Sequence, residues 1–258
     1  MANLPTTTVS GLPIADASRQ DLLAHLLGLS EEIRLGIRQE PVTVYAAHVT
    51  ALRARDRDAA TPAMAHADVL HADGASVVLC ARALGARSVE RYPTTDLGGD
   101  LIRHMAQVRG CPVRVALIGG PEGLAESAIS ALERFGATVV FSTHGFHPDW
   151  GGVLNEVRSA SPELVVVGLG APREQEFVES NRAQLPAAMV VTCGGWFGFL
   201  SGHENRAPGW MQGAGLEWIY RLAQSPRRLW RRYVRGAVDV ALILLRSTIR
   251  RTPAAGPR

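Results

Sequence analysis

One carboxylate stands where it could do chemistry: Asp73 ends the short apolar run of residues 69–72 and is followed at once by Gly74. An aspartate at the end of a parallel strand points into the crevice where open α/β proteins bind their ligands. In that place a carboxylate can accept the proton of an attacking hydroxyl group. Asp73 could instead cap a helix over residues 75–84, which is a common role for aspartate. The local sequence leaves both roles open.

Two glycine-rich turns could bind phosphate. Residues 119–123 follow the apolar run 113–118, and residues 168–172 follow the apolar run 164–167. Such turns present backbone N–H groups and a helix N-terminus to a phosphate or diphosphate, although either turn alone could simply connect a strand to a helix. The first turn lacks a glycine of the dinucleotide fingerprint, which counts against a soluble dehydrogenase. Two turns at one sheet edge favour a nucleotide-like ligand.

Metal ligands are only weakly indicated. Residues 56–58 (Asp-Arg-Asp) have the spacing with which some sugar-nucleotide enzymes hold a divalent cation. They fall in a predicted helix between arginines, however, and oxygen-ligand sites need converging carboxylates. His144 and His147 have no cysteine or carboxylate cluster beside them, which favours a structural role. The three cysteines are far apart and indicate free thiols. We therefore expect neither a metal nor a cofactor.

Predicted apolar strands alternate with predicted helices along most of the chain. These elements would position Asp73 and the two glycine-rich turns. Strands are expected at residues 42–46, 69–70, 113–118, 138–141, 164–167 and 189–192. Helices are expected to start near Ser18 and to cover residues 49–60, 75–84, 97–108, 124–135, 152–159 and 175–184. Residues 6–16 are predicted to be polar and turn-rich. This alternation predicts an α/β fold with a doubly wound, mostly parallel sheet.

The C-terminal part differs in charge from the rest. All 27 basic residues are arginine, and ten lie at or after Arg221, where Asp239 is the single acidic residue, so this tail carries +9. The preceding part has 17 arginines against 23 acidic residues, which is −6. The asymmetry indicates an anionic partner for the tail. We divide the chain into an α/β domain, residues 1–205, and a basic helical appendage, residues 206–258.

A helix starting at Pro226 would place its arginines on one face and Leu229, Trp230, Tyr233 and Val234 on the opposite face. This pattern is typical of a helix in a membrane interface, and equally of a helix docked on a domain with a solvated arginine face. The apolar run that follows is well short of the ~20 residues that span a bilayer. Because the chain also opens without a signal-peptide pattern, we expect a cytoplasmic protein that is peripheral to the membrane.

In the order and spacing of its short motifs, the chain resembles the WecG/TagA/CpsF family of bacterial glycosyltransferases over nearly its whole length. The order and spacing of short motifs carry the resemblance: residues 72–74; Arg91 with 96–97; 117–120; 144–145; 168–170 with Pro172 and 175–176; 194–195; 206–208; 217–218 with 220–222; and 227–233. The resemblance implies a Rossmann-like, doubly wound α/β fold of the glycosyltransferase type called GT-E, with an arginine-rich helical C-terminal appendage.

For function, the resemblance implies transfer of an N-acetylated hexosamine, typically N-acetylmannosamine or its uronic acid, from UDP to a polyprenyl-diphosphate-linked sugar in cell-surface polymer synthesis. Family members are regarded as inverting and metal-independent, and they act at the cytoplasmic face of the membrane. The implied partners are a UDP-sugar donor, a polyprenyl-diphosphate-linked acceptor and an anionic membrane surface, with no nucleic acid. The resemblance leaves a homo-oligomer open.

The resemblance also assigns residue roles. Asp73 matches the proposed general base, and without a metal, arginines and backbone N–H groups must stabilise the departing diphosphate. The substrate-binding candidates in the α/β domain are Ala46, His48, Arg91, Asp96, Gly119, Gly120, Gly170, Pro172, Gln175, Glu176, Gly194 and Gly195. Those in the appendage are Arg206, Arg221, Arg227, Arg228, Arg231 and Arg232.

Several departures from the family pattern concern substrate recognition. The family usually has Thr-Pro-Asn-Pro where this chain has residues 46–49 (Ala-Ala-His-Val), so two polar contacts change. Thr94 replaces a usual glycine, Glu174 stands as an extra residue before Gln175, and Gly198 stands where an aspartate is common. The alternative interpretation is therefore a nucleotide- or lipid-binding protein that keeps the fold with altered catalysis.

Overall fold

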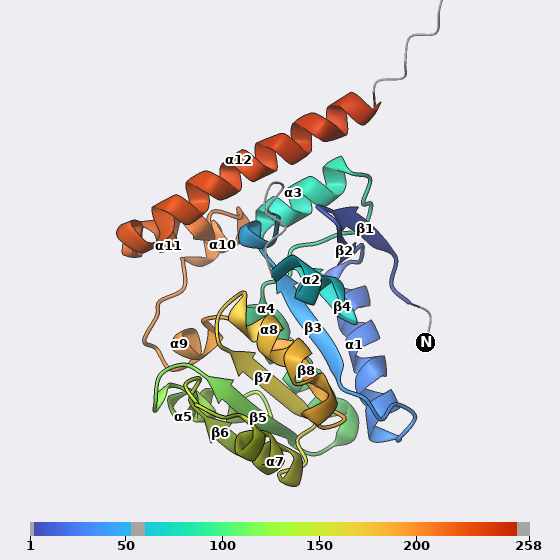
Figure 1. The fold of residues 1–258 in the computed structure, drawn as a ribbon, viewed down its shortest axis with the longest axis vertical. Coiled ribbons are helices and arrows are strands. Elements are labelled where there is room, and N and C mark those ends of the chain that lie inside the picture. The colour runs from blue at the N-terminus through green and yellow to red at the C-terminus, as the bar shows by residue number, and fades with distance from the viewer. Residues whose placement is uncertain (1–2, 53–59, 252–258) are drawn as a thin grey trace, which may run out of the picture.

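The computed structural model describes residues 3–52 and 60–251, and a six-stranded parallel sheet runs through the centre of this part (Figure 1). Its strand order is β4-β3-β8-β7-β5-β6. The strands are β3 (Val42–Ala47), β4 (Val69–Ala72), β5 (Val113–Gly119), β6 (Ala137–Thr143), β7 (Leu164–Gly168) and β8 (Met189–Thr192). Helices flank the sheet on both faces, so the predicted Rossmann-like, doubly wound α/β fold is confirmed.

The strands are nearly continuous apolar runs because both faces of the sheet are covered. In β7, Val165 and Val167 pack into the core on one face, and Leu164 and Val166 pack into the core on the other. All four side chains are at most 1% exposed. Successive side chains point to opposite faces of a strand, so a single apolar run serves both cores.

The two faces carry different elements. One core includes α1 (Arg19–Arg34), α4 (Thr94–Arg109), α5 (Leu124–Ser127), α6 (Ile129–Glu133) and α9 (Trp196–Leu200). The other includes α2 (Ala60–Ala65), α3 (Ala75–Ala83), α7 (Gly151–Ser159) and α8 (Arg173–Ser180). The 3-10 turns η1 (Val49–Leu52) and η2 (Arg182–Gln184) complete the connections.

The structure differs from the predicted elements in three places. Residues 6–16 form an antiparallel hairpin of β1 (Thr6–Val9) and β2 (Leu12–Ala15), because Ser10 and Gly11 take positive φ values of 52° and 83° in its two-residue turn and its apolar side chains enter the core. The predicted helix 124–135 is divided into α5 and α6. Of the predicted helix 49–60, only η1 and the first residue of α2 lie among the described residues.

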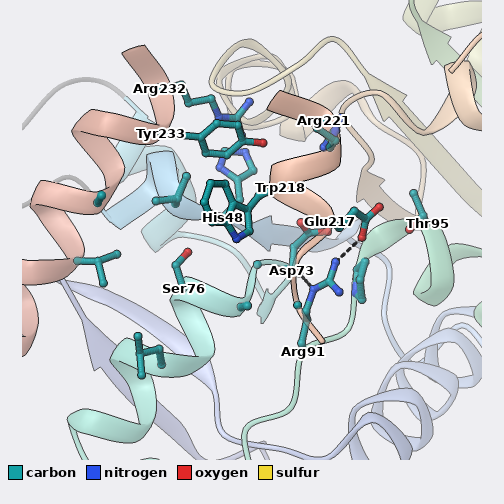
Figure 2. A pocket seen from close by; sticks show the side chains of 18 of the residues that line it. His48, Asp73, Ser76, Arg91, Thr95, Glu217, Trp218, Arg221, Arg232 and Tyr233 are labelled. Atoms are coloured by element: carbon teal, nitrogen blue, oxygen red, sulfur yellow. Dashed lines mark hydrogen bonds and ion pairs between the residues drawn. The ribbon is translucent and has the colours of Figure 1, made fainter. Parts of the chain in front are cut away.

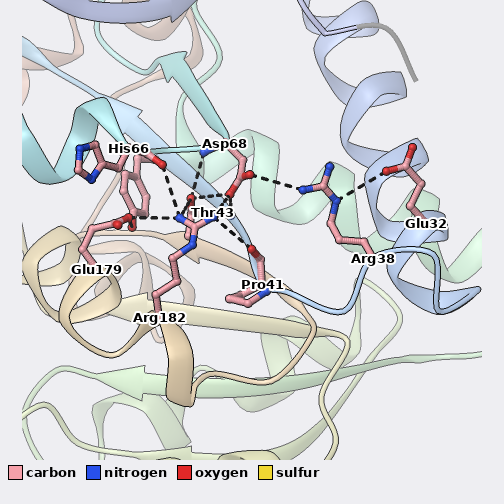
Figure 3. Close-up of polar contacts among 9 residues, drawn as sticks. Glu32, Arg38, Pro41, Thr43, His66, Asp68, Glu179 and Arg182 are labelled. Atoms are coloured by element: carbon pink, nitrogen blue, oxygen red, sulfur yellow. Dashed lines mark hydrogen bonds and ion pairs between the residues drawn. The ribbon is translucent and has the colours of Figure 1, made fainter.

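A polar network fastens the amino ends of β3 and β4, away from Asp73 (Figure 3). Asp68 accepts hydrogen bonds from the backbone N–H and the hydroxyl group of Thr43, both at 2.9 Å, and pairs with Arg182 at 2.7 Å. Tyr45 donates to Glu179 at 2.6 Å. The network joins both strands to Glu179 in α8 and to Arg182 in η2, so it holds the strands whose other ends lead to Asp73 and His48.

The appendage consists of α10 (Gly209–Gly213), α11 (Glu217–Gln224) and α12 (Pro226–Arg251). The long α12 crosses the molecule beside α3 (Figure 1) and packs on α3 and η1. Gly236 marks a close approach, because a Cβ atom there would lie 2.3 Å from Val49 Cγ2. Within residues 3–52 and 60–251, no helix has an apolar stretch long enough to cross a membrane.

The faces of α12 differ from those predicted. Leu229 is only 9% exposed and Tyr233 is half-buried, whereas Trp230 and Val234 are 49% and 56% exposed. The predicted apolar face is therefore split: Leu229 and Tyr233 are buried or half-buried, with Tyr233 against Trp218 of α11, and Trp230 and Val234 face solvent. The sequence leaves open a helix in a membrane interface and a helix docked on the domain. The structure shows α12 docked on α3 and η1, and the membrane interface stays a prediction.

Candidate active site

A cavity of about 450 Å³ lies between the α/β domain and the appendage, at the carboxyl ends of β3 and β4 (Figure 2). The domain contributes the segments after these strands and the start of α4, and the appendage contributes α11 and α12. The polar and aromatic residues on the cavity wall are His48, Asp73, Ser76, Arg91, Thr95, Phe199, Glu217, Trp218, Arg221, Arg232 and Tyr233.

Asp73 is fixed on this wall by contacts with two neighbouring elements. Its N–H donates to Ala47 O at 3.0 Å, which continues the pairing of β4 with β3. Its carboxylate Oδ1 accepts the Thr94 N–H at 2.9 Å. Thr94 is the first residue of the 16-residue α4, whose N-terminal dipole stabilises a negative charge. Asp73 thus supports α4, not α3, which begins after Gly74 without a side-chain cap.

His48 lies on the same wall as a neutral imidazole. Thr50 Oγ1 lies 2.7 Å from its Nδ1. Burial lowers the pKa of His48 to about 4; the charge of Arg232 lowers it further, and the charge of Asp73 acts in the opposite direction. The ring is therefore uncharged at pH 7. Ala46, the neighbouring predicted contact, is buried within β3 and does not line the cavity.

Arg91 links Asp73 to the appendage. Its Nε donates to Asp73 O at 3.1 Å, and Nη1 donates to Gln212 O at 3.0 Å. Nη2 pairs with Glu217 at 2.6 Å, as Figure 2 shows. The predicted substrate contact Arg91 is therefore at the site, where its guanidinium also holds α11 against the end of β4.

Arg206 and Asp96 extend this ionic network. Arg206 pairs with Asp96 at 2.6 Å and approaches Glu217 to 3.8 Å. The Nε and Nη2 atoms of Arg206 are buried and have no hydrogen-bond partner among the described residues. The structure thus brings Arg91, Asp96 and Arg206 together around Glu217. Asp96 and Arg206 themselves lie outside the cavity wall.

Two more predicted arginines reach the cavity, both from the appendage. Arg221 lies 3.8 Å from Glu204, with its guanidinium over the Phe199 ring, and Arg232 comes from α12 (Figure 2). Beside them, the rings of Trp218 and Tyr233 are 5.6 Å apart. Arg227 and Arg231 are exposed on α12 outside the cavity wall, and the side chain of Arg228 falls outside the described part.

The glycine turns lie along the same sheet edge, outside the cavity wall. Gly119 and Gly168 end β5 and β7 side by side, and a Cβ atom on Gly119 would lie 2.3 Å from Gly168 O. The Gly120 N–H donates to the same oxygen at 3.1 Å. Because the chain continues from β5 to β6 and from β7 to β8, on opposite sides, this pair marks a topological switch point, where such sheets bind ligands.

Glu174, which departs from the family pattern in sequence, carries a buried carboxyl group. It is 3% exposed, and its Oε2 accepts the N–H groups of Gly170 and Gly194, each at 3.0 Å. Burial raises the pKa of Glu174 to about 7, and the charge of Asp73 adds to this. Gln175 is fully buried beside it and donates to Oε1 at 3.3 Å. No local sequence signal reveals this burial.

The remaining predicted residues are close in sequence to Glu174 or to its partner Gly194. Pro172 precedes α8, Glu176 is half-buried in its first turn, and Gly195 follows Gly194. Glu217 and Trp218 were missed as site residues, although they stand in a motif that carries the family resemblance. Within residues 3–52 and 60–251, no three His, Cys, Asp or Glu side chains are placed to hold a metal ion, and residues 56–58 lie outside those ranges.

Comparison with known proteins assigns the family. The sequence model of the glycosyl transferase WecG/TagA/CpsF family matches residues 7–254, nearly the whole chain. The chain belongs to this family. Among solved structures, a crystal structure from Silicibacter pomeroyi described as a branched-chain amino acid ABC transporter matches with a TM-score of 0.30 and 16% identity. The match covers 70% of this chain and 50% of that protein, and a likeness so low carries no argument.

As a WecG/TagA/CpsF glycosyltransferase, the protein has both kinds of group that sugar transfer needs within one cavity. Asp73 is a carboxylate that can accept a proton. Arg91, Arg221 and Arg232 are cations that can stabilise a leaving anion. The two kinds come from different parts of the chain, so the cavity is complete only with the appendage in place.

Proposed function

We propose that this glycosyltransferase moves an N-acetylhexosamine from a UDP-sugar to a polyprenyl-diphosphate-linked acceptor, with inversion and without a metal ion. N-acetylmannosamine, its uronic acid or a related sugar is the proposed donor group. The observation that supports this most is the position of Asp73 in a cavity whose other wall carries Arg221 and Arg232. A neutral leaving group would need no such pair of cations, whereas a diphosphate does.

In the proposed reaction Asp73 acts as general base. The acceptor hydroxyl group gives its proton to the Asp73 carboxylate while its oxygen bonds to the anomeric carbon of the donor sugar. The bond from that carbon to the diphosphate breaks, and its electron pair leaves with UDP. The Thr94 N–H and the α4 dipole keep the carboxylate oriented for this transfer. Attack from the face opposite UDP inverts the anomeric centre.

The nucleotide is proposed to lie across the turns after β5 and β7. Their position at the switch point supports this placement. A side chain at Gly120 would be a poor test, because φ is +72° there and a Cβ atom would lie 2.7 Å from Leu124 Cδ2. Hydrogen exchange with and without UDP avoids this problem. With UDP, slower hydrogen exchange is expected at residues 119–124 and 168–175, and no change is expected in β1 and β2. Slower exchange only in other segments would contradict this placement of the nucleotide.

A panel of UDP-sugars tests the reaction itself. Each donor is incubated with a short-chain polyprenyl-diphosphate-linked sugar, and both UDP release and the anomeric configuration of the product are measured. The proposal predicts UDP release that depends on the acceptor and a product of inverted configuration. UDP binding without release on any donor would favour the alternative, a nucleotide-binding protein of altered catalysis.

Attachment to the inner face of the cell membrane is proposed through the outer surface of α12. Trp230, Val234, Val238 and Leu245 are each about half exposed on this helix, and Arg227, Arg231 and Arg235 are exposed beside them. Apolar side chains flanked by arginines suit a helix lying in an anionic interface. Each basic residue near such a surface is worth about 1 kcal/mol at moderate salt.

Outward-facing substitutions test the attachment without disturbing the core. The triple variant Trp230→Ser, Val234→Ser and Leu245→Ser is expected to lose sedimentation with anionic vesicles while still releasing UDP on a soluble acceptor. Ile37→Ser with Val108→Ser is the matched control, since these side chains are 72% and 65% exposed away from α12. Undiminished vesicle binding by the triple variant would remove the membrane proposal.

A further inference from the structure

Glu174 joins two loops that follow neighbouring strands. Its Oε2 accepts the N–H of Gly170, after β7, and the N–H of Gly194, after β8, each at 3.0 Å. The first bond is local, because Glu174 also donates its own N–H to Gly170 O at 3.2 Å at the start of α8. The second crosses 20 residues of sequence. The first hydrogen bond is sufficient for a helix start. The second is not needed there, and it ties the loop after β8 to the start of α8.

The Gly194 loop leads to the cavity. A Cβ atom on Gly195 would lie 3.9 Å from Arg221 Nη2 and 3.7 Å from Glu204 Oε2. Arg221 lines the cavity beside Asp73. The position of the Gly194 loop therefore sets the surface against which Arg221 lies, and Glu174 is the side chain that fixes this loop to the glycine turn after β7.

The surroundings of Glu174 make its charge sensitive to pH. Burial is the main cause that raises its pKa to about 7, and the two glycine N–H groups and the Gln175 amide oppose it. The titratable groups that face it are Asp73, from the end of β4, and Cys193, from the end of β8. Burial raises the pKa of Cys193, so this thiol stays neutral near pH 7.

We propose that Glu174 is a positioning residue for sugar transfer, whose ionised carboxylate holds the loops after β7 and β8 where the donor diphosphate binds beside Arg221. The inference rests on the proposed function. An ionised carboxylate binds N–H groups about twice as strongly as a neutral acceptor does. Protonation of Glu174 therefore loosens both loops, and the donor binds less tightly.

The first test observes the loops directly and needs no activity. In protein labelled with 15N-glycine, the amide signals of Gly170 and Gly194 are followed from pH 5.5 to pH 8.5. Both signals are expected to shift with one common midpoint near pH 7 in the unchanged protein, and to stay constant in Glu174→Gln. Absence of this titration, or its persistence in Glu174→Gln, would overturn the proposal.

The second test asks whether the loops matter to the donor. UDP affinity is measured by calorimetry at pH 6 and pH 8 for the unchanged protein, Glu174→Gln and the exposed control Glu156→Gln. The titration of UDP itself is common to all three proteins. At pH 8, Glu174→Gln is expected to bind UDP about fivefold more weakly than the other two, and at pH 6 the three should converge.

Kinetics then separate positioning from a purely structural role. At pH 8, Glu174→Gln is expected to raise the donor KM by a similar factor while kcat changes less than twofold. Equal UDP affinity and donor KM in Glu174→Gln and the unchanged protein would overturn the proposal even if the glycine signals titrate. Failure of the unchanged protein to bind UDP would instead contradict the proposed function, and the glycine signals would still decide whether Glu174 holds the loops.

Discussion

Replacing Glu174 by glutamine should change how the stability of the protein depends on pH. A carboxyl group whose pKa is raised by folding holds its proton more tightly in the folded state than in the unfolded state. Its contribution to stability is therefore fully present below pH 4.5, the unfolded value, and is lost as the pH rises through about 7. At about 1.4 kcal/mol per pH unit, the free energy of unfolding falls by about 3 kcal/mol over this range.

Glutamine fits the same space and carries no charge. Its amide oxygen can accept both glycine N–H groups, and the buried Gln175 Oε1, which has no hydrogen-bond partner among the described residues, can turn to accept from its NH2 group. The variant should therefore match the unchanged protein near pH 5. At pH 8 its free energy of unfolding should be higher by up to about 3 kcal/mol.

Urea unfolding at pH 5, 6, 7 and 8 measures the free energy of unfolding of Glu174→Gln and of the unchanged protein. Subtracting one free energy from the other at each pH removes the contributions of the titrating groups that both proteins share. Glu156→Gln makes the same chemical change at an exposed position of α7. The free energies of unfolding of Glu156→Gln and of the unchanged protein should differ by the same amount at every pH. A difference for Glu174→Gln that is equally constant from pH 5 to pH 8 would refute the reasoning. If the free energies differ as expected, the negative charge of Glu174 at pH 8 lowers the stability of the protein while it holds the loops for donor binding.

Two further predictions concern the appendage. Glu217→Gln removes the buried carboxylate that pairs with Arg91 and lies near Arg206, so limited proteolysis between α9 and α11 should be faster. Turnover should fall by about fivefold to 150-fold, given losses of about 1–3 kcal/mol for such groups. Unchanged proteolysis would show that the ion pairs do not hold the appendage. Gly236→Val places a side chain against Val49, so the free energy of unfolding measured with urea should fall by about 1–3 kcal/mol. Gly152→Ala adds a methyl group in open space on α7, so it should leave the free energy of unfolding nearly unchanged.

The sheet was predictable from the sequence because its strands are continuous apolar runs separated by glycine turns. Residues 113–118 and 164–167, for example, lie within β5 and β7. The β1–β2 hairpin was missed because β1 is Thr-Thr-Thr-Val and β2 contains Pro13, so neither strand is a continuous apolar run. Its burial depends on a tertiary contact that local pattern does not contain.

The candidate site was predictable where one residue ends a strand. Asp73 and His48 follow β4 and β3, and both line the cavity. Partnerships across the chain were not predictable: the Thr94 N–H on Asp73 and the Arg91–Glu217 pair join segments 21 and 126 residues apart. Glu174 illustrates the same limit, because its sequence neighbours suggest a helix start while its burial arises from the packing of β7 against β8.

Turnover of Asp73→Asn tests the central claim most directly. Asparagine keeps an oxygen for the Thr94 N–H, so the start of α4 and the cavity should persist, but the proton acceptor is lost. Sugar transfer at a saturating donor concentration should fall by about two to four orders of magnitude, while UDP affinity measured by calorimetry stays within about twofold. Transfer by Asp73→Asn at close to the normal rate would contradict the assignment of Asp73 as the general base.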